Sequence, residues 1–379
     1  MKIVIAPDSF KESMTAKEVC DAVEKGMKKI LTDAEFVHAP MADGGEGTTQ
    51  SLADATGGKI YFEECMGPLG EKVKAKLGLL GNGHIAVLEM ASASGLELVP
   101  RSKRNPMITT TYGTGELIKK ALDLGVKTII VGIGGSATND GGAGMIQALG
   151  GKLLDKNGKN IGFGGGELSK LEKIDLTEMD SRIKNTKFIV ASDVQNPLTG
   201  ETGASNIFGR QKGATEEMVV ILDNNLRKFA EIIRRDVGKD VENIPGAGAA
   251  GGLGAGLMAF LNAELKKGID IVIEYSHLEE KIKGADLVIT GEGNIDGQTR
   301  FGKTPYGVVS VAKKYGIPTI TLAGGIGKDI DILYDYGFDA IFSIMQKVES
   351  LEDAIKNGKI NMEKTAENIA RIIKVLRKK

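Results

Sequence analysis

The sequence predicts an α/β fold in which both ends of the chain contribute to one parallel-sheet domain. Short apolar runs alternate with amphipathic helices near each end, and polar or glycine-rich turns follow the apolar runs. A predicted hairpin interrupts this alternation in between. We therefore expect a discontinuous, Rossmann- or flavodoxin-like domain from residues 1–63 and 285–379, with residues 64–284 inserted as a mixed α/β domain and a ligand in the interdomain cleft.

The first residues follow a strand and helix alternation. Lys2–Pro7 is a predicted buried strand, and Thr15–Leu31 has apolar residues at spacings of three and four behind a threonine that can cap the helix. A strand at Phe36–Pro40, a helix at Glu46–Thr56 and a strand at Lys59–Glu64 continue the pattern. Such alternation is typical of parallel sheets, because parallel strands need a crossover connection.

The middle of the chain is less regular. Lys72–Leu80 and His84–Met90 flank a Gly-Asn-Gly turn and predict an antiparallel hairpin. Gly162–Gly166 predicts a flexible crossing or lid, and Pro245–Gly256 predicts a glycine face packed against a sheet, with ligand contact as the alternative. Elsewhere in this segment we expect two strands and four helices. The strands are Lys127–Val131 and Lys187–Ser192. The helices are Gly113–Leu124, one that ends at Leu149, Thr215–Asp236 and, after the Pro245–Gly256 run, Leu257–Leu265.

The alternation returns near the C-terminus. We expect a strand, a helix and two more strands at Asp286–Thr290, Pro305–Tyr315, Pro318–Ala323 and Ala340–Ser343, followed by a basic helix. A chain of 379 residues is longer than one hydrophobic core usually serves, which agrees with two domains.

Composition excludes several classes of partner. Lys and Arg number 49 against 50 Asp and Glu and are dispersed, tryptophan is absent and aromatics make up 5%, so we expect no nucleic-acid partner. No uncharged apolar run approaches the length of a membrane span, and no export signal is predicted. Cys20 and Cys65 are too few for a disulfide framework, which favours the cytoplasm. The oligomeric state stays open, with a homodimer as one alternative.

The most informative motif is GIGGSATNDGGAGM, from Gly132 to Met145, between a predicted strand and a helix. Glycines in such a turn leave backbone N–H groups open to an anion, and phosphate is the first candidate. Asp140 adds a carboxylate that suits magnesium or a proton, while a tight turn with a helix cap is the alternative. The predicted phosphate-binding residues are Gly134, Gly135, Ser136, Thr138 and Asn139.

Four other strand ends carry carboxylates beside small or hydroxylic residues, at Ala6–Ser13, Met41–Thr48, Ala191–Gly200 and Ile289–Gly297. Open α/β sheets bind ligands at such ends. A fifth segment, Gly297–Thr304, satisfies the Walker A pattern, yet the predicted strand before it stops at Thr290 and GEGNID intervenes. The context therefore argues against a true P-loop.

Carboxylates are the predicted acid and base groups, because the three histidines lie outside these turns. Phosphoryl transfer to an alcohol needs a carboxylate near the hydroxyl, magnesium on the phosphates and cations nearby. Asp193 and Asn196 have a spacing that places both in one site, although an Asx turn is the alternative. Glu292 and Asp296 are candidate magnesium ligands or helix-dipole partners.

The first two turns and the start of the helix at Pro305 supply further candidates. Lys11 offers a cation for an acidic substrate, and Lys303 lies near predicted helix N–H groups. Asp43 suits a substrate hydroxyl or a metal, and Asp8 and Ser9 suit a substrate or a simple helix cap. A solvated lysine and an ordinary turn are the alternative interpretations.

Taken in order, APDSFKES, ADGGEGT, GIGGSATNDGGAGM, DVQNPLTG with GRQKGA, PGAGAAGGLGAG and TGEGNIDGQTRFGKTPYGV resemble the glycerate kinase type 1 family from Met1 to about Ser343. The resemblance implies a two-domain α/β fold and ATP- and Mg²⁺-dependent phosphorylation of D-glycerate, usually to 2-phosphoglycerate. The chain has Arg210 where the family often has proline, and Asn294 where it often has arginine, so neither receives a role.

The resulting hypothesis assigns roles from chemistry. Asp193 orients or deprotonates the attacking hydroxyl, with Lys11 and Asp43 beside it as catalytic residues. The Gly134 to Asn139 turn holds the ATP phosphates, and Glu292 with Asp296 positions Mg²⁺. The glycerate carboxylate lies toward Lys11 and Lys303, and the expected substrate-binding residues are Asp8, Ser9, Asn196 and Lys303.

Two other functions stay open. A nucleotide-dependent oxidoreductase also uses glycine-rich turns, but it needs GxGxxG in an early βαβ unit, and the first turn, PDSFKES, has no glycine. A non-catalytic sensor of a small hydroxy acid is the second. Release of ADP in proportion to glycerate separates both from a kinase.

Overall fold

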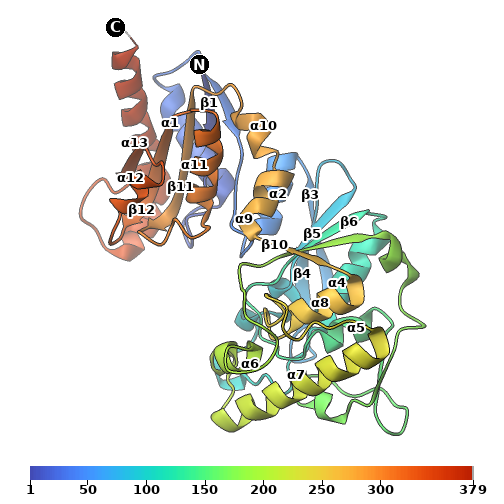
Figure 1. Cartoon of the computed structure of the whole chain (residues 1–379). Helices are drawn as coiled ribbons and strands as arrows, with labels where there is room; N and C mark the ends of the chain where they lie inside the picture. The colour runs from blue at the N-terminus through green and yellow to red at the C-terminus, as the bar shows by residue number, and fades with distance from the viewer. Residues whose placement is uncertain (378–379) are drawn as a thin grey trace. The chain divides into compact units, whose positions relative to one another are not determined.

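The computed structural model describes residues 1–377, which form two compact units. Unit 1 comprises Met1–Gly57 and the chain from Ile269 onward, and unit 2 comprises Gly58–Gly268. Figure 1 shows the first and the last described residues, coloured blue and red, in unit 1. In residues 1–377 no helix has the length and apolar character needed to cross a membrane.

Unit 1 contains a five-stranded parallel sheet in the order β13-β12-β11-β1-β2. Its strands are short and rich in β-branched residues, which suits strands covered on both faces. In chain order they are β1 Lys2–Ile5, β2 Glu35–His38, β11 Leu287–Ile295, β12 Thr319–Ile326 and β13 Ala340–Ser343.

The connections of this sheet diverge between β1 and β11, which are hydrogen-bonded neighbours. From β1 the chain passes through α1 (Ala16–Lys28) to β2 on one side, and from β11 it passes through α11 (Thr304–Lys314) to β12 on the other. Ligands of open parallel sheets bind outside the carboxyl ends of the strands at such a divergence. The sheet therefore points to the ends of β1 and β11.

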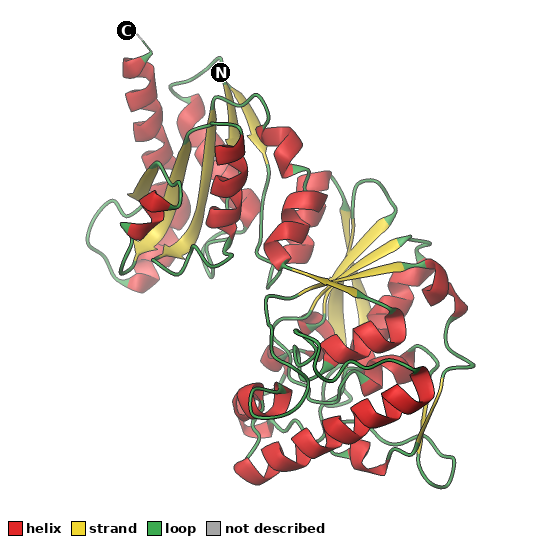
Figure 2. Cartoon of the chain, in the orientation of Figure 1, coloured by secondary structure: helices red, strands yellow, loops and turns green. Residues whose placement is uncertain are grey.

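Helices cover both faces of this sheet, as Figure 2 shows. On one face Met27 of α1 and Met362 of α13 (Leu351–Leu376) pack with Ile3 and Ile5 of β1. On the other face Val309 of α11 packs with the end of β11 and with α12 (Ile332–Asp335). Unit 1 also contains α2 Thr48–Thr56, α9 Gly268–Tyr275 and α10 Leu278–Ile282.

Unit 2 is built on a mixed six-stranded sheet in the order β10-β9-β6-β5-β4-β3. Strands β5, β6, β9 and β10 are parallel, and β3 and β4 extend the sheet as antiparallel strands. The strands are β3 Lys59–Met66, β4 Lys72–Leu79, β5 Ile85–Glu89, β6 Thr128–Gly132, β9 Lys187–Ala191 and β10 Glu264–Lys266. A separate pair consists of β7 Lys152–Leu154 and β8 Lys173–Asp175.

Six helices pack around this sheet and enclose a core that includes Leu117, Phe188 and Phe229. The longest is α7, Glu216–Val237, whose first turn is capped by Thr215. The others are α3 Ala91–Ser94, α4 Tyr112–Asp123, α5 Ala143–Ala148, α6 Ala204–Phe208 and α8 Leu253–Leu261.

The predicted fold class is confirmed: the chain ends form a parallel sheet, and a mixed α/β segment is inserted. The predicted hairpin is present as β4 and β5, and Thr15 caps α1 in a capping box with Glu18. The unit boundaries differ from the expected ones. Strand β3 pairs with β4 along its length and so lies in unit 2, whereas α10 lies in unit 1.

Two local predictions were wrong. Strand β11 continues to Ile295 instead of ending at Thr290, because Gly291 approaches Leu322 so closely that a Cβ would overlap its carbonyl oxygen. Gly162–Gly166 is not an open lid, since a Cβ on Gly165 would lie 2.5 Å from the carbonyl oxygen of Asn139. The glycines that read as flexible there permit close packing.

The Pro245–Gly256 run does pack closely, as expected, but Gly251 and Gly256 meet the turn after β6 and not a strand. A Cβ on Gly256 would lie 2.5 Å from the carbonyl oxygen of Gly141, and one on Gly251 would overlap that of Thr138. Gly141 also donates its N–H to the carbonyl of Gly251, at 3.1 Å. The run therefore supports the turn that follows β6.

Candidate active site

Unit 1 brings three carboxylates to the ends of neighbouring strands. Asp8 follows β1, Asp43 follows β2, and Glu292 lies in the last part of β11. The Asp8 carboxylate accepts hydrogen bonds from the N–H of Ser9, at 2.6 Å, and from the hydroxyl of Thr304, at 2.5 Å. The sheet therefore gathers residues that are hundreds of positions apart in the chain.

These carboxylates carry more negative charge than their surroundings compensate. Burial raises the pKa of Asp8 to about 6, with the charge of Asp43 adding to the rise and the bond from Thr304 opposing it. Burial also raises the pKa of Glu292 to about 7; Lys303 and Thr299 oppose this, and the charges of Asp8 and Asp43 add to it. Carboxylates whose pKa values are raised in this way gain from a nearby cation, which makes the group a candidate cation site.

Lys303 and Thr304 stand at the start of α11, where helix N–H groups point outward. The Lys303 Nζ lies 3.6 Å from Glu292 Oε1. Because β11 ends at Ile295, Gly297–Thr304 does connect a strand to a helix, so the sequence argument that GEGNID separates it from its strand was wrong. Several of its N–H groups are already bonded within the protein, among them those of Gly297, Gln298 and Thr299.

The other residues predicted around this site have mixed surroundings. Asp296 accepts a bond from the N–H of Gln298, at 2.9 Å, whereas Glu292 accepts one from the hydroxyl of Thr299, at 3.0 Å. Lys11 is exposed. Its backbone nitrogen lies 3.6 Å from the position that a Cβ on Gly293 would occupy, so the loop after β1 runs close to β11. In residues 1–377 no group of three or more His, Cys, Asp or Glu side chains is arranged to hold a metal.

Unit 2 contains the glycine-rich turn after β6, and the turn has two distinct parts. Gly134 and Gly135 are exposed, and Gly135 has a left-handed φ of +71°. Ser136, Thr138 and Asn139 are buried instead, and their side chains bond within the protein. The Thr138 N–H donates to Ser136 Oγ at 3.1 Å, and Asn139 Nδ2 donates to Ser205 Oγ at 2.9 Å. Only the glycines face outward in this turn.

Asp140 holds this turn against the start of α4 and α5. Its carboxylate accepts bonds from the N–H and hydroxyl of Thr111, both at 2.9 Å, and from the N–H groups of Gly142 and Gly144. Burial raises its pKa, and these bonds oppose the rise. The capping alternative therefore describes Asp140 better than a magnesium ligand does.

Asp193 follows β9, the strand hydrogen-bonded to β6, so its loop starts beside the glycine-rich turn. Asp193 is exposed. Asn196 supports the loop itself: its Nδ2 donates to the carbonyl of Thr202 at 2.8 Å, and its own carbonyl accepts from Gly248. The amide predicted to face a substrate is thus engaged in holding the backbone.

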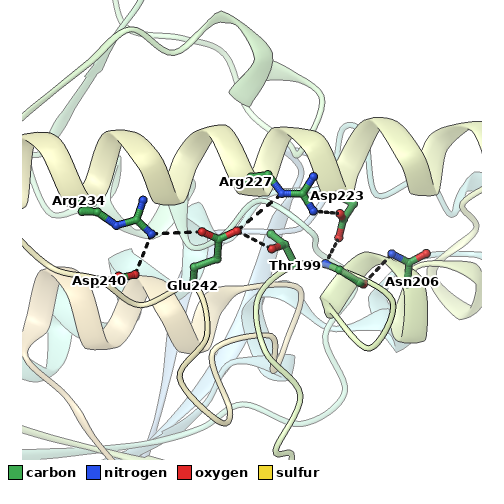
Figure 3. Close-up of polar contacts among 8 residues, drawn as sticks. Thr199, Asn206, Asp223, Arg227, Arg234, Asp240 and Glu242 are labelled. Carbon is green, nitrogen blue, oxygen red and sulfur yellow. Dashed lines mark hydrogen bonds and ion pairs between the residues drawn. The ribbon is translucent and has the colours of Figure 1, made fainter.

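Figure 3 shows how the rest of this loop is fixed to α7. Thr199 donates its hydroxyl to Glu242 at 2.8 Å, and the N–H of the next residue donates to Asp223 at 3.0 Å. Arg227 pairs with Asp223 at 3.1 Å, and Arg234 reaches Glu242 at 3.2 Å. A network of several charges holds the loop more firmly than a single surface pair does.

Sequence reasoning missed two residues of these sites. Thr304 was not singled out, although it bonds to Asp8 across nearly 300 positions. Lys212, in the quoted GRQKGA, was not singled out either, yet it is buried beneath the glycine-rich turn. Its neighbour Arg210, one of the departures from the family pattern, is exposed and paired with Glu216 at 2.7 Å. No sequence signal separates a buried lysine from a solvated one.

Comparison with known proteins agrees with the resemblance seen in the motifs. The model of the glycerate kinase family matches residues 3–374. A glycerate kinase of Haemophilus influenzae is 56% identical over 98% of this chain and 99% of its own length. A glycerate 2-kinase of Escherichia coli is 55% identical over 98% of this chain and 97% of its own.

A solved structure gives the same result for the fold. The crystal structure of a Salmonella typhimurium LT2 protein, described provisionally as glycerate kinase 2, matches with a TM-score of 0.92 at 51% identity. The match covers 100% of this chain and 99% of the other. The chain therefore belongs to the glycerate kinase family and is an enzyme, a kinase that acts on glycerate.

Proposed function

We propose that this enzyme transfers the γ-phosphoryl group of ATP to the 2-hydroxyl of D-glycerate and releases ADP and 2-phosphoglycerate. A bond forms between the hydroxyl oxygen and phosphorus, the bond from phosphorus to the β,γ-bridging oxygen breaks, and the hydroxyl proton passes to a base. The full-length similarity to a protein named glycerate 2-kinase supports the position of transfer. The observation that carries the chemistry is the half-buried set of Asp8, Glu292 and Lys303 in unit 1.

In unit 1 we propose a magnesium site at Glu292 and Asp296, directly or through water. Carboxylate oxygens are the ligands that Mg²⁺ prefers, and it often keeps most of its waters beside one or two of them. The raised pKa of Glu292 supports this, because a carboxylate that lacks compensating charge gains most from a cation. When bound, Mg²⁺ neutralises negative charge on the phosphates.

Glycerate also binds in unit 1 in this proposal. The carboxylate of glycerate pairs with Lys303 and Lys11. The hydroxyl groups of glycerate form hydrogen bonds with Asp8, Ser9 and Asp43. The Lys303 ammonium has only Glu292 as an ion-pair partner in the described part of the chain, at 3.6 Å, so it can also pair with a carboxylate from a ligand. A cation is needed because glycerate carries one negative charge.

In unit 2 we propose that the turn after β6 holds the ATP phosphates. The exposed Gly134 and Gly135 allow a phosphate to approach the backbone, and the buried Ser136, Thr138 and Asn139 keep the turn in shape. Asp193, on the next loop, orients or deprotonates the attacking hydroxyl in this proposal. We also propose a cytoplasmic setting, which the two free buried cysteines support.

The direct test is a coupled assay for ADP with D-glycerate as the acceptor. We expect ADP release in proportion to glycerate, and little release when glycerate is omitted. A hydroxy-acid sensor or an oxidoreductase would release none. Phosphorus NMR of the product then reads the position of the phosphate, and a signal from 3-phosphoglycerate alone would contradict transfer to the 2-hydroxyl.

A further inference from the structure

Lys212 is a lysine whose side chain lies inside unit 2. It ends a short 3₁₀ helix, Arg210–Lys212, and only 2% of its surface is exposed. Its Nζ donates to the carbonyl oxygen of Thr138 at 2.7 Å and to Ser136 Oγ at 3.2 Å. Both acceptors belong to the turn after β6, so the ammonium group lies directly behind that turn.

The protein compensates this charge only in part. Asp140 favours the charged lysine, but the carboxylate of Asp140 is already bonded to Thr111, Gly142 and Gly144. Burial prevails and lowers the pKa of Lys212 to about 7. A buried cation with neutral hydrogen-bond partners is costly for a fold, and apolar residues of similar volume are often tolerated better. Stability alone therefore does not account for a lysine here.

The segment that carries Lys212 is fixed to the same turn at a second point. Ser205, in α6, accepts the bond from Asn139 Nδ2. Gly213 follows Lys212 with a φ of +94°, and a Cβ there would overlap the carbonyl oxygen of Arg104. In residues 1–377 the buried Oδ1 of Asn139 has no hydrogen-bond partner, so one acceptor of the turn is left unsatisfied.

We propose that Lys212 is a positioning residue that shapes the Gly134 to Asn139 turn and provides, from behind it, the positive charge with which unit 2 attracts the phosphate groups of ATP. This rests on the proposed function, which places ATP at the turn. The residue acts through Ser136 and Thr138, and its charge raises the affinity of the exposed glycines for an anion.

The first test compares Lys212→Met with wild type. Methionine keeps most of the volume and removes the charge, so we expect ATP, titrated without glycerate in a calorimeter, to bind at least about tenfold more weakly, a typical loss for one well-placed charge. The melting temperature should stay equal or rise, since the desolvation penalty disappears. Lys212→Arg should recover part of the affinity, because it keeps the charge.

The control is Lys281→Met. Lys281 is half-buried in unit 1, burial lowers its pKa too, and it donates to the carbonyl of Ala55 at 2.9 Å. This control should leave ATP affinity unchanged. Unchanged ATP affinity in Lys212→Met would overturn the inference, and so would equal losses for ATP and D-glycerate. ADP release by wild type tests the proposed function separately, because it does not depend on where ATP binds.

A second test uses wild type, so it does not depend on a variant that folds. An anion beside Lys212 raises the pKa of the lysine, and Asp140 is the charged group that already faces it from the turn. At pH 8, calorimetry in buffers of different ionisation enthalpy should show uptake of up to about one proton as ATP binds. Absence of uptake, or the same uptake in Lys212→Met, would contradict the role of the charge.

Discussion

The two units place groups of opposite charge near the loops that follow their parallel strands: carboxylates in unit 1, and a lysine behind the turn after β6 in unit 2. Unit 1 has Asp8 and Glu292, whose pKa values are raised by burial, whereas unit 2 has Lys212, whose pKa is lowered by burial. In both units the charge is poorly compensated by its own surroundings. The difference teaches that burial leaves negative charge under-compensated in unit 1 and positive charge under-compensated in unit 2, which agrees with the proposal of magnesium in unit 1 and a triphosphate in unit 2.

The largest expected effect concerns Asp193, a carboxylate in unit 2, the unit in which we propose that ATP binds. Asp193→Asn should lower kcat by about 10²- to 10⁴-fold if the residue is the general base, with little change in melting temperature because the side chain is exposed. Steady-state kinetics with saturating ATP and glycerate measure this. Near-normal turnover in this variant would show that Asp193 is not the general base.

Asp8→Asn is the matched variant for that outcome. Asp8 lies in unit 1 with a pKa near 6, which also suits a proton acceptor. If Asp8→Asn loses more turnover than Asp193→Asn, the proton of the attacking hydroxyl is accepted in unit 1. The assignment of the general base to unit 2 would then be wrong.

The next effect concerns the cation site. Glu292→Gln removes the carboxylate charge while keeping its size, so we expect the Mg²⁺ concentration needed for half-maximal activity to rise about 10- to 100-fold, the range seen when metal sites lose supporting groups. A magnesium titration at fixed ATP measures it. Glu264→Gln, on the exposed edge strand β10 of unit 2, is the control and should not shift the titration.

The two units should also respond oppositely to pH. Glu292 has a pKa of about 7 in the folded protein, above its value in the unfolded chain. Its contribution to the free energy of unfolding is therefore complete below about pH 4.5 and is lost as the pH rises through 7. Lys212 has a pKa of about 7 in the folded protein, below its value in the unfolded chain. Its contribution to the free energy of unfolding is therefore complete above about pH 10.5 and is lost as the pH falls through 7.

Melting curves of the ligand-free variants test this. Glu292→Gln should melt higher than wild type at pH 8 and similarly near pH 4.5. Lys212→Met should melt higher than wild type at pH 6, with the gain shrinking toward pH 10. Gains with the same pH trend in both variants would break the comparison.

The smallest effect concerns Thr304, which donates its hydroxyl to Asp8. Thr304→Val leaves that half-buried carboxylate without one donor, so the free energy of unfolding should fall by about 1–3 kcal/mol at pH 8. The loss should shrink near pH 4, where Asp8 is protonated in the folded protein. Chemical denaturation at the two pH values measures it, with the exposed Thr177→Val as a control expected to change little.

Local signals in the sequence predicted much of the fold correctly. The capping threonine of α1, the hairpin of β4 and β5, and the amphipathic helix α7 all depend on neighbouring residues. The length of β11 was not predictable in this way. GEGNI reads as a turn by composition, and it becomes strand because Gly291 allows β12 to approach.

The site was predicted unevenly for the same reason. Asp8, Asp43 and Glu292 stand at strand ends, where parallel sheets collect polar side chains, so their grouping followed from the pattern. The roles of Asn196 and Asp140 did not follow. A carboxylate or amide in a turn has the same sequence signature whether it faces a ligand or holds its own backbone.

The sequence by itself determined the order of strands and helices, the family and the set of polar turns, because these depend on periodicity and on residue types within short windows. Only the tertiary structure decided which charges are buried. Burial depends on contacts between distant segments, such as Thr304 with Asp8 and Lys212 with Thr138, and the cost of removing a charge from water is what changes its pKa and its chemistry.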